Sequence, residues 1–263
     1  KDEKDSTRGR ANSLRLALSG QLGKDALTSE KMDDTMKLCV SCKACKRECP
    51  TGVDMSKMKI EISSLRAKKF GLDINSKLVA FLPNYAPIAS KFSLIMNLRD
   101  KLPGLAKLSE VFLGFTSKRP LPKWRSDYFK NKELPNNLNE IKNTTPVILF
   151  VDTFNRYYEP ENVRSAIKVL KKAGYYPFIP TLSNSSKILC CGRTYLSNGL
   201  IDNAKHEMLN ILNAFRPYLK QGISVVGLEP SCILSFRDEI PNLIKSEDTE
   251  YLKNNSYTFE ELL

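Results

Sequence analysis

The chain of 263 residues carries 41 Lys or Arg against 29 Asp or Glu, which gives a formal net charge of +12 at pH 7, and 41% of its residues are hydrophobic. That length and that hydrophobic share predict one large or two modest folded domains and argue against a disordered polymer. The positive charge suits nucleic acid, an anionic membrane surface or an acidic protein partner, but no nucleic-acid-binding module accompanies it, so no nucleic-acid partner is expected. No apolar run approaches the ~20 residues that a membrane-spanning helix needs.

Residues 1–71 are predicted to form short helices around a cysteine loop. Three helices are expected, and each begins near a residue whose side chain can cap it: Ser6 or Thr7, Ser29, and Asp54. Glycines are expected to end the first and third of these helices: Gly20 and Gly71. The third helix should bury one apolar face, formed by Met58, Ile62 and Leu65.

Residues 72–145 are predicted to be a connector of small amphipathic helices. Prolines at positions 83, 87, 103, 120, 122 and 135 break its apolar stretches, among them 92–98 and 108–115. We interpret these helices as packing against the flanking domains. The alternative is a patch that docks on a membrane surface or on a partner.

Residues 146–263 alternate between strand and helix patterns. Continuous apolar or β-branched runs predict three strands, at 146–151, 176–179 and 223–228, and helical periodicity predicts helices at 161–173, 200–218 and 232–237. Such alternation predicts a doubly wound parallel sheet with its functional groups at the carboxyl ends of the strands. The expected fold class is therefore α+β overall, with a helical domain, a helical connector and an α/β domain.

The seven cysteines do not form the pattern of a secreted disulfide framework. Four lie within eleven residues, two are adjacent, and the count is odd. Clustered thiols persist best in a reducing compartment and no signal peptide opens the sequence, so a cytoplasmic location is expected.

Four of these cysteines form one run of ligand-like spacing: Cys39, Cys42, Cys45 and Cys49, followed by Pro50. This is a C-x2-C-x2-C-x3-C-P run, the spacing of ferredoxin-type 4Fe-4S ligation. Short intervals let the thiolates and backbone N–H groups face one centre, and the proline turns the chain away after the last ligand. Structural zinc sites usually separate two cysteine pairs by a dozen or more residues, and no such gap exists here.

Two features of the run bear on its chemistry. Lys37, Lys43, Lys46 and Arg47 crowd it, which should raise the reduction potential of a negatively charged cluster or guide an electron-transfer partner. In two-cluster ferredoxins the fourth cysteine of each run serves the other cluster, so Cys49 has two possible roles.

A second candidate site joins Cys190, Cys191 and Cys232. The first two precede Gly192 in the loop after the second predicted strand, and the third follows the end of the third strand. Neighbouring loops of a parallel sheet can bring three sulfurs together, and Gly192 would let the backbone approach a bulky cluster. The alternative is that all three are small buried hydrophobic residues. The single histidine, His206, lies within a predicted helix and is expected on the surface.

Four stretches together resemble the iron–sulfur part of FAD-linked D-2-hydroxyacid dehydrogenases, the family that oxidises D-lactate, glycolate and D-2-hydroxyglutarate. They are residues 5–11 (DSTRGRA), the cysteine run with residues 50–54 (PTGVD), residues 190–193 (CCGR) and residues 227–232 (GLEPSC). The chain departs from many Cys-Cys-Gly domains after the first strand, where residues 151–154 (VDTF) contain no cysteine.

This resemblance implies a segment that passes electrons singly from a flavin domain outside this chain to an acceptor such as a quinone. It implies a 4Fe-4S cluster, a second iron–sulfur cluster as a further possibility, and FAD upstream. A second Cys-Cys-Gly domain would follow downstream, and peripheral contact with the inner membrane is a further expectation. Arg8, Arg10, Arg47 and Arg193 stand in the shared motifs and are hypothesised to tune charge. The rival hypothesis is a metal-stabilised binding or scaffold module that engages a membrane or nucleic acid.

Overall fold

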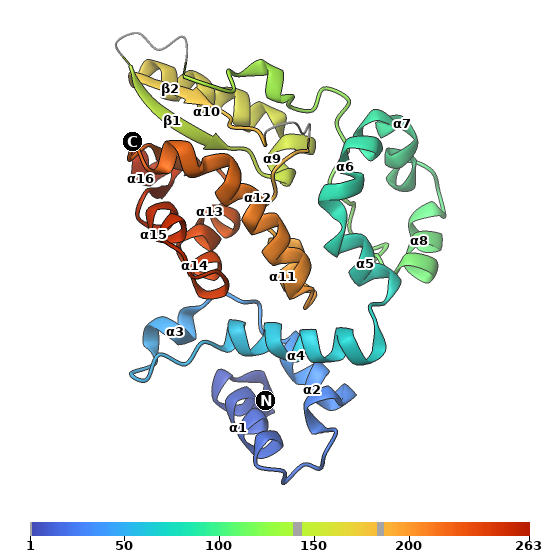
Figure 1. Cartoon of the computed structure of the whole chain (residues 1–263). Helices are drawn as coiled ribbons and strands as arrows, with labels where there is room; N and C mark the ends of the chain where they lie inside the picture. The colour runs from blue at the N-terminus through green and yellow to red at the C-terminus, as the bar shows by residue number, and fades with distance from the viewer. Residues whose placement is uncertain (1, 139–143, 183–186) are drawn as a thin grey trace. The chain divides into compact units, whose positions relative to one another are not determined.

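A computed structural model describes residues 2–138, 144–182 and 187–263, and it shows a mostly helical chain with one four-stranded parallel sheet (Figure 1). This agrees with the predicted α+β class. The chain divides into two units: one contains Lys1–Ala80 with Thr194–Ile201, and the other contains Phe81–Arg193 with Asp202–Leu263. Residues 139–143 of the predicted connector lie outside the described residues.

The first unit is built from short helices. Its α-helices are α1 (Thr7–Leu18), α2 (Glu30–Lys37), α3 (Ala44–Glu48), α4 (Met55–Phe70) and α5 (Ile74–Ala80), and its 3-10 helices are η1 (Glu3–Asp5) and η2 (Ala26–Thr28). The three predicted caps are confirmed. Ser6 accepts a hydrogen bond from the Gly9 N–H, Ser29 from the Met32 N–H, and Asp54 from the Lys57 N–H.

The core of the first unit joins α1, α2 and α4 around sulfur-containing side chains. Its buried members include Leu14, Met32, Met36, Cys39, Met55 and Ile62. The predicted apolar face of α4 is only partly correct, because Ile62 is buried while Met58 and Leu65 are exposed.

Small side chains explain why α4 turns a different face inward. Ser56 and Ser64 are buried on this helix. At Gly199, in the 194–201 segment of the same unit, an added Cβ would lie 2.4 Å from the Ser63 carbonyl carbon and from the Ser64 N atom. Backbone therefore packs directly against α4, and serines leave room that larger apolar residues would fill.

The second unit contains the parallel sheet, in the order β2-β1-β3-β4. Its strands are β1 (Thr145–Phe150), β2 (Tyr175–Phe178), β3 (Ser224–Gly227) and β4 (Ser256–Thr258). In the register, Val147 of β1 stands opposite Pro177 of β2 and Ser224 of β3. The strand order reverses between β1 and β3, so the sheet has a topological switch point there. The three predicted strands are confirmed; β4 was not predicted.

The helices of the second unit connect these strands and extend before and after them. They are α6 (Leu82–Lys91), α7 (Ser93–Met96), α8 (Leu105–Leu113), α9 (Thr153–Tyr157), α10 (Pro160–Lys172), α12 (Ile201–Leu219), α13 (Pro230–Arg237), α14 (Glu239–Leu243), α15 (Glu247–Asn254) and α16 (Phe259–Leu262); α11 (Arg193–Ser197) begins here and continues into the first unit. The 3-10 helices are η3 (Asn97–Asp100) and η4 (Asn131–Glu133). Within the described ranges no helix combines the length and apolarity needed to cross a bilayer.

The core around the sheet also includes residues that precede β1 in the sequence. Phe129 and Leu134 belong to the same cluster as Val147, Leu149 and Val226. The Phe129 N–H donates to the Arg156 carbonyl at 3.0 Å, which ties this stretch to α9.

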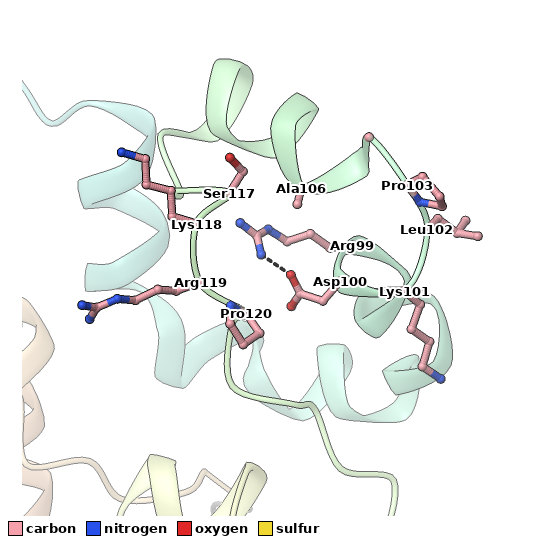
Figure 2. A pocket seen from close by; sticks show the side chains of 11 residues that line it. Arg99, Asp100, Lys101, Leu102, Pro103, Ala106, Ser117, Lys118, Arg119 and Pro120 are labelled. Carbon is pink, nitrogen blue, oxygen red and sulfur yellow. Dashed lines mark hydrogen bonds and ion pairs between the residues drawn. The ribbon is translucent and has the colours of Figure 1, made fainter.

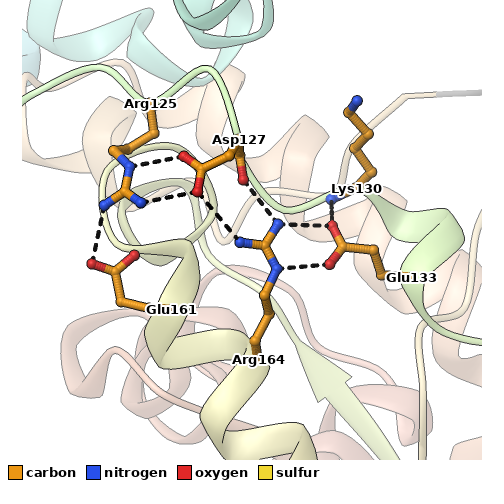
Figure 3. A network of polar contacts seen from close by, with 6 residues as sticks. All are labelled: Arg125, Asp127, Lys130, Glu133, Glu161 and Arg164. Carbon is orange, nitrogen blue, oxygen red and sulfur yellow. Dashed lines mark hydrogen bonds and ion pairs between the residues drawn. The ribbon is translucent and has the colours of Figure 1, made fainter.

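A network of ion pairs fastens the same stretch to α10 (Figure 3). The Arg164 guanidinium donates to the Glu133 carboxylate, with the shortest contact at 2.8 Å, and its other face approaches Asp127. Arg125 bridges Asp127 and Glu161. Arg164 therefore joins α10 to the 3-10 helix η4.

Candidate functional site

The cysteine run occupies the loop and short helix between α2 and α4 in the first unit. Cys39 follows Leu38, which caps the end of α2, and is buried; Cys42 is exposed, and Cys45 and Cys49 are half-buried. Cys45 lies in α3 and Cys49 ends that helix. The four residues thus fall on a tightly turned stretch whose two ends are fixed by core helices.

The backbone of this stretch adopts a conformation that residues with side chains seldom take. Ser41 has φ of 57° and Lys43 has φ of 59°, and Gly52 after the last cysteine has φ of 67°. A left-handed residue that is not glycine costs roughly 1–2 kcal/mol, so the surroundings must hold it in place. Left-handed residues in such loops turn successive N–H groups toward one side, which is the basis of backbone anion sites, including those for iron–sulfur clusters.

Hydrogen-bond donors already point at two of the four sulfur atoms. The Met55 N–H donates to Cys45 Sγ at 3.4 Å, and the Thr51 hydroxyl lies 3.1 Å from Cys49 Sγ. The Thr51 hydroxyl, followed by the backbone N–H groups of Val53, Thr51 and Gly52, lowers the pKa of Cys49 below its ordinary value. These contacts favour the thiolate, which is the form that binds metals.

Two cationic side chains donate hydrogen bonds to backbone carbonyls at the start of the cysteine run. The Lys59 ammonium donates to the Cys39 carbonyl at 2.6 Å, and the buried Arg10 guanidinium donates to the Leu38 carbonyl at 3.2 Å. Arg10 was hypothesised to tune charge, and the structure gives it a positioning contact next to Cys39. By contrast, Arg8 is 87% exposed at its side chain and pairs with Glu3, and Arg47 is exposed.

Some features of these residues fit a metal cluster, and one feature does not. Four thiols at ferredoxin spacing, left-handed loop residues and N–H groups aimed at sulfur suit an anionic iron–sulfur cluster. In the described part of the chain, however, no three His, Cys, Asp or Glu side chains are grouped closely enough to hold a metal ion. Binding would therefore require the cysteine thiols to lie closer to one centre than they do here.

The second cysteine site lies at the carboxyl ends of β1 and β3 in the second unit. Cys191 Sγ donates to Cys232 Sγ at 3.1 Å, and the Gly192 N–H donates to Cys190 Sγ at 3.4 Å. All three thiols are buried. The predicted approach of these two loops is confirmed, whereas ligation by the three cysteines stays a prediction.

Gly192 makes a close packing contact that was not predicted, while the predicted approach to a cluster stays a prediction. Its φ of +78° is a conformation that favours glycine, and an added Cβ would lie 3.0 Å from the Ala204 carbonyl oxygen of α12. The contact that requires glycine here is thus with α12.

The second site is acidic, and this distinguishes it from the first. The hydrogen bond with Cys191 lowers the pKa of Cys232, but burial and the Asp152 and Glu229 carboxylates outweigh it and raise that pKa overall. Hydrogen bonding with Cys191 and burial raise the pKa of Cys190 well above its ordinary value. The nearby Arg193 is itself paired with the buried Glu239.

Asp152 lies in the stretch 151–154 that follows β1 and contains no cysteine. Its carboxylate caps α9, accepting from the Phe154 N–H at 2.9 Å and the Asn155 N–H at 3.0 Å. Burial raises its pKa. Sequence reasoning noted the missing cysteine without assigning Asp152 a role, and its place directly after a buried strand was the available signal. Glu229, Thr51 and Lys59 were likewise missed, and His206 lies on the surface as predicted, with 69% of its side chain exposed.

Comparison with known proteins points to the dehydrogenases. No protein-family model and no solved structure matches the chain. It is 23% identical over 227 residues to D-2-hydroxyglutarate dehydrogenase of Pantoea ananatis, covering 82% of this chain and 21% of the relative. It is 22% identical over 232 residues to D-2-hydroxyglutarate dehydrogenase of Escherichia coli, covering 85% of this chain and 22% of the relative.

A second kind of relative belongs to a dehydrogenase that is divided into subunits. One subunit of the anaerobic glycerol-3-phosphate dehydrogenase of Escherichia coli is 24% identical over 162 residues, covering 61% of this chain and 40% of the relative. The chain spans about a fifth of the length of the two D-2-hydroxyglutarate dehydrogenases. The similarity is thus to segments or subunits of dehydrogenases, at low identity.

Proposed function

We propose that this chain is the iron–sulfur electron-transfer segment of an FAD-linked D-2-hydroxyacid dehydrogenase, an oxidoreductase of the cytoplasm or of the inner face of a membrane. Cys39, Cys42, Cys45 and Cys49 would hold a 4Fe-4S cluster. Electrons would come from a flavin domain outside this chain and leave to an acceptor such as a quinone. The similarity to two kinds of dehydrogenase supports this class.

One observation carries the proposal: a C-x2-C-x2-C-x3-C-P run whose loop holds two left-handed non-glycine residues and aims donors at Cys45 and Cys49. Strained loops persist where a function uses them. Inert packing cysteines would need neither the spacing nor the strain.

The residues of this chain would act on a cluster by positioning and by electrostatics. A bound 4Fe-4S cluster supplies one-electron oxidation and reduction. Lys59 and Arg10 fix the backbone at Cys39, and the Thr51 hydroxyl and the Gly52 and Val53 N–H groups stabilise negative charge on Cys49. Hydrogen bonds and cations of this kind raise a reduction potential.

The second site supports a different expectation. Cys190, Cys191 and Cys232 would hold a second iron–sulfur cluster only with their protons removed, and Asp152 and Glu229 oppose that.

The test is metal analysis after anaerobic purification. We expect iron and acid-labile sulfide, brown protein with broad visible absorption, and an EPR signal on reduction. Cys39→Ser should lose the signal of the first cluster, whereas Cys190→Ser, which changes a cysteine outside the run, should retain the signal of that cluster. Colourless protein that contains stoichiometric zinc, or a spectrum unchanged in Cys39→Ser and Cys42→Ser, would contradict the proposal in favour of a metal-stabilised scaffold.

A further inference from the structure

One segment of the second unit exposes most of its large apolar side chains. It lies between α6 and the aromatic residues that precede η4. From residue 94 to residue 120 no residue is buried. Leu94 of α7 is 78% exposed and Val111 of α8 is 73% exposed. Other large apolar side chains on or between these helices share this exposure: Ile88 of α6, Phe92 between α6 and α7, Ile95 of α7 and Phe112 of α8. Exposed apolar groupings of this kind mark interaction surfaces.

Polar contacts, rather than an apolar core, hold this segment in its fold. We define the α7–α8 hairpin as residues 93–120. The Arg99 guanidinium of η3 donates to the Ser109 hydroxyl of α8 at 2.9 Å and to the Thr116 carbonyl at 2.7 Å. Both α7 and α8 pack against η3. Because Arg99 ties the hairpin together from inside, its apolar side chains are left to face outward.

Aromatic residues anchor the base of the hairpin to the second unit. Trp124 lies 4.7 Å from Tyr158 and 6.0 Å from Tyr85, measured between ring centroids. Asn97 of η3 is bound to the Trp124 backbone through two hydrogen bonds of 2.9 Å. The hairpin is thus a fixed projection of its unit and not a loose loop.

The charge of this segment indicates which kind of surface the segment would bind. Residues 91–123 contain seven Lys or Arg against two Asp or Glu. Both carboxylates are engaged within the segment: Asp100 pairs with Arg99, and Glu110 accepts from the Ser117 hydroxyl at 2.6 Å. Five of the seven cations are lysines, a residue depleted at protein–protein interfaces but common beside apolar residues on membrane-surface helices.

Three of these cations extend from the rim of a hollow between η3 and the chain after α8. The hollow has a volume of about 410 Å³, and the Arg99–Asp100 pair lies within it. Figure 2 shows Lys101, Lys118 and Arg119 extending away from the middle of this hollow. Across the described residues these three form no ion pair with a carboxylate, so their charge is free for an external anion.

We propose that the α7–α8 hairpin docks this protein on an anionic phospholipid surface. The apolar side chains of α7 and α8 enter the boundary between headgroups and acyl chains, and Lys101, Lys118 and Arg119 contact the lipid phosphates. The docking does not depend on a cluster, and it therefore stands or falls separately from the proposed electron transfer.

The test is co-sedimentation of the protein, purified without detergent, with vesicles. One set is pure phosphatidylcholine and the other contains about one quarter phosphatidylglycerol. We expect about tenfold stronger partitioning to the anionic vesicles, weakened by high salt. Leu94→Glu combined with Val111→Glu should lose about tenfold in binding. Lys101→Gln, Lys118→Gln and Arg119→Gln together should reduce anionic binding to the level of pure phosphatidylcholine.

A matched control is Val169→Glu on α10, an exposed apolar residue outside the hairpin, which should bind as the unchanged protein does. Circular dichroism and thermal unfolding verify that each variant is folded. Two outcomes overturn the proposal: wild-type protein that stays in the supernatant with both vesicle types, or hairpin variants that bind vesicles unchanged. Wild-type oligomers that Leu94→Glu and Val111→Glu convert to monomers, without vesicle binding, would assign the surface to a second copy of the chain and would equally overturn it.

Discussion

Cys191 Sγ and Cys232 Sγ lie 3.1 Å apart, although 41 positions separate the two residues in the sequence. The loop after β2 carries one of them and the first turn after β3 carries the other, so the parallel sheet creates the contact. The proximity occurs where the strand order reverses, the usual ligand position of such sheets. Burial and neighbouring carboxylates, however, keep Cys232 protonated more strongly than a free thiol.

The first prediction concerns the reactivity of these thiols. In cluster-free protein at pH 8, iodoacetamide should modify the exposed Cys42 rapidly and leave Cys190 and Cys232 largely unmodified, because only thiolates react and the pKa values of both buried thiols are raised. Peptide mass spectrometry after timed quenching measures each site. Unfolding in urea is the control and should equalise the rates. Equal rates in the folded protein would contradict the buried geometry.

The second prediction tests the hydroxyl beside Cys49. Thr51→Val removes the largest of the contacts that lower the pKa of Cys49, so the thiolate fraction at pH 7 should fall and alkylation of Cys49 should slow by about two- to fivefold in cluster-free protein. The pH profile of that rate should shift to higher pH. Thr116→Val, in the α7–α8 hairpin, is the matched control and should leave the profile in place. An unshifted profile for Thr51→Val would show that the backbone N–H groups alone set this pKa.

Local sequence signals predicted much of the fold. Ser6, Ser29 and Asp54 were identifiable as caps because capping depends on residues within one turn. The buried face of α4 was not, because the backbone around Gly199, more than a hundred residues away, determines it. The strand β4 was missed because its three residues, Ser256–Thr258, are too short for a periodic pattern.

In the candidate sites, too, local sequence signals were predictable, whereas contacts between distant residues were not. The spacing of Cys39 to Cys49 is a local signal, and β-α-β alternation was enough to predict that Cys191 and Cys232 approach each other. The contacts of Thr51, Lys59 and Arg10 depend on side-chain positions in three dimensions, as does the pairing of Arg193 with Glu239. The sequence pattern of the α7–α8 hairpin could not show which way its apolar side chains face. The same pattern fits helices that pack inward and a hairpin that Arg99 holds together with its apolar side chains exposed.

The third prediction concerns the backbone contact at Gly199. Gly199→Ala places a Cβ 2.4 Å from backbone atoms of Ser63 and Ser64, and φ at this position is +74°. We expect it to lower the free energy of unfolding by roughly 2–3 kcal/mol, measured by urea denaturation. Gly222→Ala is the matched control, since φ there is +72° but nothing lies within 4 Å, and it should cost only about 1 kcal/mol. Equal losses would mean that conformation alone, without the close approach, matters at Gly199.

The fourth prediction is a pH dependence carried by Glu133. The hydrogen bond from Arg164 lowers the pKa of Glu133 below its ordinary value of 4.5. A lowered folded pKa stabilises the fold above the unfolded pKa, and this contribution disappears as pH falls through the folded value. Glu133→Gln should therefore lose about 0.5–1 kcal/mol of unfolding free energy at pH 7, discounted for partial exposure, and less than that near pH 3, which lies below the ordinary pKa. Urea denaturation at both pH values measures this, with Glu260→Gln, an exposed carboxyl with no ion pair among the described residues, as the control. An equal loss at both pH values would indicate that Glu133 stabilises the link from η4 to α10 by neutral hydrogen bonds, because only a charge-dependent contribution disappears when the carboxylate is protonated.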